Sequence, residues 1–189
     1  MGKDVVKDSS NVKRLINLSP QETAVAGHLS VSENLVLMGK VYGLDKQAAL
    51  KRTGKLIELM DLGERAKEPV KKLSGGMMRR LSIAMALISN PQVLFLDEPT
   101  LGLDPRSRKT LWSIIKRMKG HKTVLLTTHY LEEADALSDR LAIIDKGKIV
   151  ASGTSNELKN KLGGIQTMTL RTENLSRSTY KKLKVRYPA

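Results

Sequence analysis

The sequence of 189 residues contains no cysteine, few aromatic residues and no long apolar run. The absence of cysteine excludes disulfide bonds and thiolate metal sites. Because aromatic residues make up only 3% of the chain, the core must be built from aliphatic side chains and methionine. No stretch of ~18 apolar residues occurs, so the sequence predicts no transmembrane helix. Residues 1–10 lack the apolar segment of a signal peptide, and we therefore expect a cytoplasmic protein.

Acidic residues are scarce relative to basic ones, since 33 Lys and Arg against 19 Asp and Glu give a net charge of +14. Half of this charge comes from the segment after Leu158, which carries eight basic residues and one acidic residue. Such a segment is either a solvated tail or a surface attracted to anionic lipid or nucleic acid. Only Tyr180 and Tyr187 are available there to stack on bases, so we expect no nucleic-acid partner.

Residues 31–88 are expected to be largely helical, because their apolar residues recur at helical spacing. Side chains that can cap a helix N-terminus precede each apolar stripe, and glycines follow the first two. The sequence predicts three helices, with N-caps at Ser32, Asp45 and Ser74 and ends at Gly43, Gly63 and Ile88.

Strands and helices alternate in the remainder of the chain, which predicts an α/β fold with a parallel sheet. Residues 1–11 are expected to be the remnant of a hairpin. Asp104 and Pro105 are typical N-cap and first residues of a helix that Gly120 ends. Further helices are expected over 131–137 and 156–162. The predicted strands cover residues 12–18, 93–97, 123–127, 141–144, 148–151 and 166–171.

Two carboxylates, Asp97 and Glu98, stand at the end of the strand 93–97. In open α/β sheets, ligands bind at the carboxyl ends of the strands. One carboxylate can therefore hold Mg²⁺, and the second can orient and deprotonate an attacking water. The alternative is an ordinary surface turn or helix start, which is the commoner explanation for an isolated Asp-Glu pair.

Ser74, Gly75 and Gly76 open the helix that begins near residue 75. Free backbone N–H groups at a helix N-terminus attract anions, and glycines allow a phosphate to approach closely. The sequence therefore indicates a phosphate-binding turn, whereas the alternative is a plain serine N-cap. Gly102, Leu103 and Asp104 form a similar turn before the next helix.

His129 and Gln21 each follow a predicted strand. A histidine at a strand end can contact a γ-phosphate or hold the attacking water. The side-chain amide of Gln21 can reach Mg²⁺ or the same water. Taken alone, His129 is more simply a capping residue and Gln21 part of a turn.

The order and spacing of LSGGM, VLFLDEPTLGLDP and TVLLTTHYLEEAD resemble the nucleotide-binding domain of ABC transporters. The resemblance covers about residues 10–165. It implies a RecA-like P-loop NTPase core, here partial, with an inserted α-helical subdomain. Met77 in place of glutamine, the following Arg79 and Arg80, and SVSENLVLMGKVYGL are similar to the ABC-2-type export branch. In that comparison the site residues are Gln21 (Q-loop), Ser74–Met77 (signature), Phe95–Glu98 (Walker B), Gly102–Asp104 (D-loop) and His129 (switch histidine).

The resemblance implies ATP as substrate and Mg²⁺ as cofactor, with roles for individual residues. Glu98 and His129 would be catalytic, and Asp97 with Gln21 would hold the metal. Residues in contact with the nucleotide would be Gln21, Ser74, Gly75, Gly76 and Asp104.

No P-loop motif, G-x-x-x-x-G-K-[ST], is present in the 189 residues. In the family this loop precedes the Q-loop by several tens of residues and holds the β- and γ-phosphates. We therefore expect an N-terminally truncated domain that does not hydrolyse ATP alone. In the family two domains bind each ATP between one P-loop and the other domain's signature, so Ser74, Gly75, Gly76 and Asp104 could still complete a partner's site.

The resemblance also predicts domains and partners. The partners are a second nucleotide-binding domain and transmembrane permease subunits, at the inner face of the cell membrane. Two alternatives are a soluble ABC-type ATPase acting on nucleic acid or ribosomes, and a non-catalytic relic or regulatory fragment. The expected domains are a partial α/β core (1–30), an α-helical signature subdomain (31–90), the remaining α/β core (91–163) and a basic extension (164–189).

Overall fold

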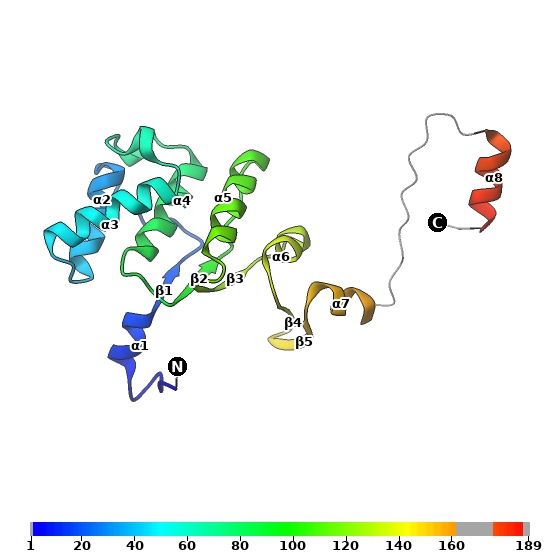
Figure 1. Cartoon of the computed structure of the whole chain (residues 1–189), viewed down its shortest axis with the longest axis horizontal. Coiled ribbons are helices and arrows are strands. Elements are labelled where there is room, and N and C mark those ends of the chain that lie inside the picture. The colour runs from blue at the N-terminus through cyan, green and yellow to red at the C-terminus, as the bar shows by residue number, and fades with distance from the viewer. Residues whose placement is uncertain (1, 162–175, 187–189) are drawn as a thin grey trace. The chain divides into compact units, whose positions relative to one another are not determined.

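A computed structural model describes residues 2–161 and 176–186 of the chain. The chain divides into two compact units, Met1–Leu141 and Ala142–Ala189 (Figure 1). The first unit contains the helices and strands that carry every site residue predicted above. The four domains expected from the sequence stay a prediction.

A three-stranded parallel sheet forms the centre of the first unit. Its order is β1-β2-β3, with β1 Ile16–Ser19, β2 Val93–Asp97 and β3 Thr123–Thr127. The register pairs Ser19 with Leu96, and Leu96 with Leu126, so that the three strands end at the same edge. This arrangement confirms the predicted parallel sheet, and it places Asp97 at the edge where ligands bind in such folds.

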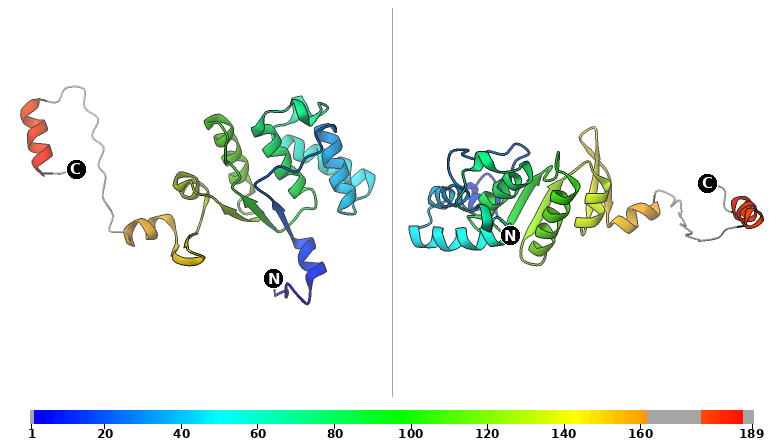
Figure 2. Two further views of the ribbon diagram at one scale, coloured as in Figure 1. Left: turned by 180° about the vertical axis from the view of Figure 1, so that it is seen from behind. Right: turned by 90° about the horizontal axis from the view of Figure 1, so that it is seen from above.

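Helices α4 (Gly75–Leu87) and α5 (Pro105–Met118) lie side by side next to the sheet (Figure 2). On one sheet face Leu94 and Leu96 are fully buried, and the hydroxyl of Ser19 lies 3.2 Å from that of Ser82 on α4. On the other face Leu18 and Leu125 are about half exposed. Helix α5 buries Leu111, Ile114, Ile115 and Met118.

Helix α2 (Val31–Val41) begins one residue before the predicted N-cap. Ser30, not Ser32, caps it in a capping box, because its hydroxyl accepts from the Glu33 N–H while the Glu33 carboxylate accepts from the Ser30 N–H. The hydroxyl of Ser32 instead donates to the Ala66 carbonyl at 2.9 Å. The predicted cap at Ser32 was therefore wrong. After α2 the chain passes through Gly43 with a φ of +79°.

Helix α3 (Lys46–Leu59) begins at the predicted cap, since the Asp45 carboxylate accepts from the Ala48 N–H at 2.8 Å. It ends four residues before Gly63, the predicted end, because Asp61 takes a left-handed φ of 52°. Gly63 starts a short 3-10 turn instead. Ser74 caps α4 as predicted. The two 3-10 turns between α3 and α4 are η1 Gly63–Arg65 and η2 Val70–Lys72.

The N-terminal residues differ from the prediction. Helix α1 (Ser9–Leu15) occupies most of the segment expected to be a strand, and residues 4–7 form a turn in which the Asp4 carboxylate accepts from the N–H groups of Val6 and Lys7. Pairing with β2 begins only at Ile16, opposite the first residue of β2. The predicted strand is therefore present but begins at Ile16 and not at residue 12. The predicted hairpin remnant 1–11 was wrong, because a turn and the start of α1 occupy its described residues.

Strand β4 (Leu141–Asp145) pairs with β5 (Lys148–Gly153) in a two-stranded sheet. The two strands are joined by Lys146 and Gly147, both at positive φ, as in tight hairpin turns. The expected place of β4 in the parallel sheet stays a prediction, because all of β4 except Leu141 belongs to the second unit. The predicted strand 166–171 lies outside the described residues. The remaining helices are α6 Leu131–Leu137, α7 Ser155–Lys161 and α8 Arg177–Arg186.

Among the residues that the structure describes, none of the helices is both long and apolar enough to span a membrane.

Candidate functional site

Asp97 and Glu98 lie at the carboxyl end of β2, next to the last residue of β3. The hydroxyl of Thr127 donates to the Asp97 carboxylate at 2.6 Å and accepts from the Glu98 N–H at 3.1 Å. One hydroxyl group therefore fixes both acidic residues. Thr127 was not among the predicted site residues, although it stands directly opposite Asp97 in the sheet register.

Glu98 and His129 form a pair, with the carboxylate Oε2 3.0 Å from the imidazole Nδ1. An ionised carboxylate only accepts, so Nδ1 donates the proton and Nε2 of a neutral imidazole is left as an acceptor. The Glu98 side chain is 20% exposed and that of His129 55% exposed. Glu98 has a left-handed φ of 44°, which turns it away from the strand direction. Two predicted catalytic residues thus meet at the sheet edge.

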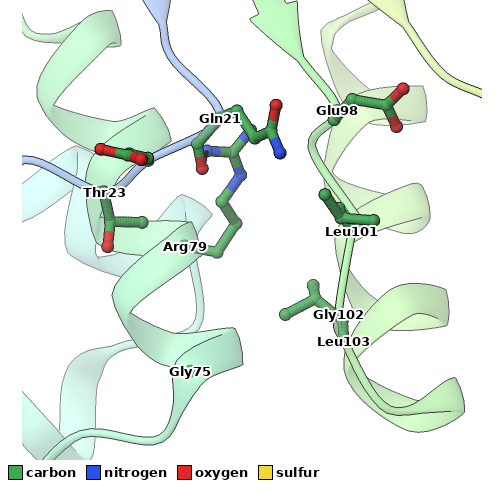
Figure 3. A pocket seen from close by; sticks show the side chains of 9 residues that line it. Gln21, Thr23, Gly75, Arg79, Glu98, Leu101, Gly102 and Leu103 are labelled. Atoms are coloured by element: carbon green, nitrogen blue, oxygen red, sulfur yellow. Dashed lines mark hydrogen bonds between the residues drawn. The ribbon is translucent and has the colours of Figure 1, made fainter.

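An open cavity of about 470 Å³ lies beside this pair. Figure 3 shows Gln21 and Arg79 on one side of it and Glu98 with Leu101 on the other. Five predicted site positions meet at this cavity, namely Gln21, Gly75, Glu98, Gly102 and Leu103. The other lining residues are Glu22, Thr23, Arg79 and Leu101.

Arg79 connects the loop after β1 to the end of β2 beside this cavity. It is 4% exposed, and its guanidinium donates to the carbonyls of Pro20, Gln21, Asp97 and Pro99. Burial lowers the pKa of Arg79 below its usual value, and the charges of Asp97 and Glu133 offset only part of this decrease. Sequence reasoning used Arg79 only as a mark of the export branch. No local pattern shows that one side chain of α4 joins the Gln21 loop to the end of β2.

The two glycines of the Ser-Gly-Gly turn at the start of α4 have different surroundings. Ser74 is the N-cap, and its hydroxyl accepts from the Met77 N–H at 3.3 Å. A Cβ at Gly75 would meet nothing within 4 Å, so this backbone is open to a ligand. A Cβ at Gly76 would lie 2.6 Å from the Ser107 hydroxyl oxygen. Gly76 is therefore explained by helix packing, independently of any phosphate.

Asp104 caps α5, and its carboxylate accepts from the backbone N–H groups of Arg106 and Ser107 at 3.0 Å. Hydrogen bonds from the side chain and the backbone of Ser107 lower the pKa of Asp104. Asp104 does not line the cavity, although Gly102 and Leu103 of the same turn do. Its part in contacting a nucleotide stays a prediction.

The lowered pKa of Asp104 makes the stability of the chain dependent on pH. The stabilisation by its carboxylate is complete above the unfolded-state pKa of about 3.9, and it is lost as the pH falls through the lower folded-state pKa. We expect Asp104→Asn, which caps without titrating, to lack this part of the acid dependence. Urea unfolding of both proteins at several acidic pH values measures it. A stability difference between them that is independent of pH would contradict this assignment.

The oxygen donors at this edge fit Mg²⁺ only as part of a larger ligand set. Among the described residues no three His, Asp or Glu side chains form a group that could hold a metal ion. Asp97 uses one carboxylate oxygen to bind Thr127, and Gln21 has an exposed amide. Mg²⁺ in nucleotide sites commonly takes one or two protein ligands besides phosphates and waters. Asp97 and Gln21 are consistent with that number.

Comparison with known families agrees with this geometry. A family model described as ABC transporter matches residues 1–101, which is more than half of the chain. The chain belongs to the ABC transporter family. This membership accounts for the parallel sheet, the Ser-Gly-Gly turn and the paired acidic residues in one chain.

Relatives within the ABC transporter family are similar over most of this chain. "Doxorubicin resistance ATP-binding protein DrrA" of Mycobacterium tuberculosis (strain ATCC 25618 / H37Rv) is 52% identical over 164 residues, which cover 86% of the chain and 49% of DrrA. "Linearmycin resistance ATP-binding protein LnrL" of Bacillus subtilis (strain 168) is 42% identical, covering 84% of the chain and 51% of LnrL. The chain thus spans about half the length of these relatives.

A solved structure supports the fold of this ABC transporter family member. It is described as "Structure of ATP binding subunit of ABC transporter" and has a TM-score of 0.72 and 24% identity. The match covers all of this chain and 74% of the solved chain. The predicted α/β fold of the P-loop NTPase type is therefore confirmed.

Proposed function

We propose that this chain is part of an ATP-binding and ATP-hydrolysing subunit of an ABC-type export transporter. The observation that carries the proposal is the 3.0 Å contact between Glu98 and His129 at the carboxyl edge of the parallel sheet, beside a cavity that also contains Gln21. The relatives named for resistance to doxorubicin and linearmycin support export as the direction of transport.

The proposed chemistry assigns a role to each side chain at the sheet edge. The Glu98 carboxylate orients a water molecule and accepts its proton, and His129 holds that carboxylate in place. Asp97 and the Gln21 amide would hold Mg²⁺, which neutralises phosphate charge when it is bound. Thr127 keeps Asp97 and Glu98 in fixed relative positions through its single hydroxyl.

Partners follow from the same proposal. We propose a second nucleotide-binding domain that takes Ser74, Gly75, Gly76 and Asp104 into its own site, and permease subunits in the membrane. The protein would then lie on the cytoplasmic face of the membrane. The exposed backbone at Gly75 supports this role of the turn, since nothing within 4 Å covers the position of a Cβ.

We expect the 189-residue chain alone not to hydrolyse MgATP, because it contains no P-loop motif. The test pairs it with the M. tuberculosis DrrA relative whose own signature serine has been replaced by arginine. That variant should be inactive alone, and adding this chain should restore phosphate release. Ser74→Arg in this chain should lower the restored rate by a factor on the order of 10²–10³.

Ser113→Arg is the matched control, because it places the same charge on the exposed side of α5, away from the cavity. It should leave the restored rate unchanged. Turnover of MgATP by the chain itself would contradict the expectation that it is inactive alone. The proposed function fails if no activity is restored, or if both arginine variants lower the restored rate equally.

A further inference from the structure

A stack of three side chains stands beside the Glu98–His129 pair. The ring centroids of His129 and Tyr130 lie 4.1 Å apart, with the ring planes tilted by 39°. The guanidinium carbon of Arg108 lies 4.5 Å from the centroid of the Tyr130 ring. The stack therefore runs from α5 through Tyr130 to the imidazole that binds Glu98.

The backbone on both sides of Tyr130 is fixed by hydrogen bonds. Its N–H donates to the Thr128 hydroxyl at 3.1 Å, and its carbonyl accepts from the N–H groups of Glu133 and Ala134, each at 3.1 Å. Tyr130 is thus the N-cap residue of α6. These bonds restrict the backbone from which the Tyr130 ring projects.

Helix α6 is in turn anchored to α5. Glu133 is fully buried, and its carboxylate accepts from the indole N–H of Trp112 at 2.9 Å. Arg108 lies one turn before Trp112 on α5, and its Nε is buried without a hydrogen-bond partner. A cation over an aromatic face is attracted by the ring quadrupole. The guanidinium of Arg108 thus supports the Tyr130 ring from the side of α5.

We propose that Tyr130, supported by Arg108, is a positioning residue that holds the imidazole of His129 against Glu98. The inference rests on the proposed function and deepens it. The His129 side chain is 55% exposed, and a single exposed hydrogen bond is a weak restraint on its rotation. Contact with the Tyr130 ring removes that freedom. Because α5 begins after Asp104, the stack also joins the start of α5 to the imidazole.

Nuclear magnetic resonance of the imidazole groups tests the proposal in the 189-residue chain without nucleotide. The chain has three histidines, so His129→Gln identifies the signals of His129. Spectra of all variants are recorded at the same alkaline pH. We expect His129 to show an upfield ring-current displacement from Tyr130 and the tautomer with the proton on Nδ1.

Substitutions of Tyr130 test whether its ring positions the His129 imidazole. Tyr130→Phe should keep both signatures, since it keeps the ring. Tyr130→Leu should lose the displacement and shift the imidazole to a mixture of tautomers, whereas Tyr180→Leu, on an exposed tyrosine of α8, should change neither. If Tyr130→Leu retains the Nδ1–H tautomer, Tyr130 does not position His129. Loss of the signatures in Tyr130→Phe as well would also overturn the proposal.

Arg108→Gln tests the support from α5. It should reduce the ring-current displacement, and the matched variant Lys109→Gln should not, because Lys109 is exposed on the same helix. An unchanged displacement in Arg108→Gln would remove Arg108 from the proposal. Fluorescence of Trp112, the single tryptophan, verifies folding of each variant. Since no nucleotide is present, failure of the restored ATPase experiment would not alter these spectra, and the two proposals can fail separately.

Discussion

Replacing Arg79 with leucine is expected to lower the free energy of unfolding by roughly 3–5 kcal/mol. The guanidinium donates to four carbonyls, two in the loop after β1 and two at the end of β2. Leucine fills part of the volume and leaves those acceptors without donors. A buried acceptor without a partner costs about 1–3 kcal/mol.

Chemical unfolding with urea measures the effect of Arg79→Leu, and Arg117→Leu is the matched control. Arg117 is exposed and donates to one carbonyl, that of Leu59 at 3.0 Å. Its loss should cost about 1 kcal/mol or less. Arg79→Lys should fall between the two, because an ammonium group cannot reach four acceptors in a plane. Equal losses for Arg79→Leu and Arg117→Leu would show that the four contacts do not stabilise the fold.

Gly76→Ala is expected to destabilise the chain by about 1–3 kcal/mol, whereas Gly75→Ala is expected to be neutral or to stabilise it by up to about 1 kcal/mol. The added Cβ at Gly76 would lie 2.6 Å from the Ser107 hydroxyl oxygen and 2.9 Å from its Cβ, so α4 and α5 would have to move apart. At Gly75 nothing lies within 4 Å. Helix propensity favours alanine equally at both positions, so only packing distinguishes the two variants.

A double substitution identifies the cause. Ser107→Gly removes both atoms that a Cβ at position 76 would meet, and it should recover most of the stability lost in Gly76→Ala. Thermal or urea unfolding of the four proteins gives the interaction energy. Additive effects of Gly76→Ala and Ser107→Gly would contradict a direct clash between the two helices.

Features that depend on a few neighbouring residues were predictable from the sequence. Asp45, Ser74 and Asp104 cap helices as expected, since a capping side chain and the apolar stripe that follows are both local. The same reasoning placed a cap at Ser32, whereas Ser30 is the residue that caps α2. Only the reciprocal bonds with Glu33 separate them. Asp97, Glu98 and His129 were predictable because each follows an apolar strand of the parallel sheet.

Features that depend on residues far apart in the sequence were not predictable. The four carbonyls that bind Arg79 lie 18 to 59 residues from it along the chain. Thr127 acts on Asp97 and Glu98 across a strand register that only the folded sheet defines. Strand β1 proved shorter than its apolar pattern because β2 offers no partner before Val93. In each case the missing information was the position of another segment, and not the identity of the residue.

The left-handed backbone of Glu98 has a cost in stability and determines where its carboxylate lies. Continued alternation along β2 would point this side chain to the same face as Leu94 and Leu96, which are buried. The φ of 44° instead brings its carboxylate to His129. A residue other than glycine in a sparsely populated conformation costs on the order of 1 kcal/mol or more. Selection for stability alone would favour glycine there, so a glutamate at this position indicates that the chain gives up folding energy to keep an acid at the sheet edge.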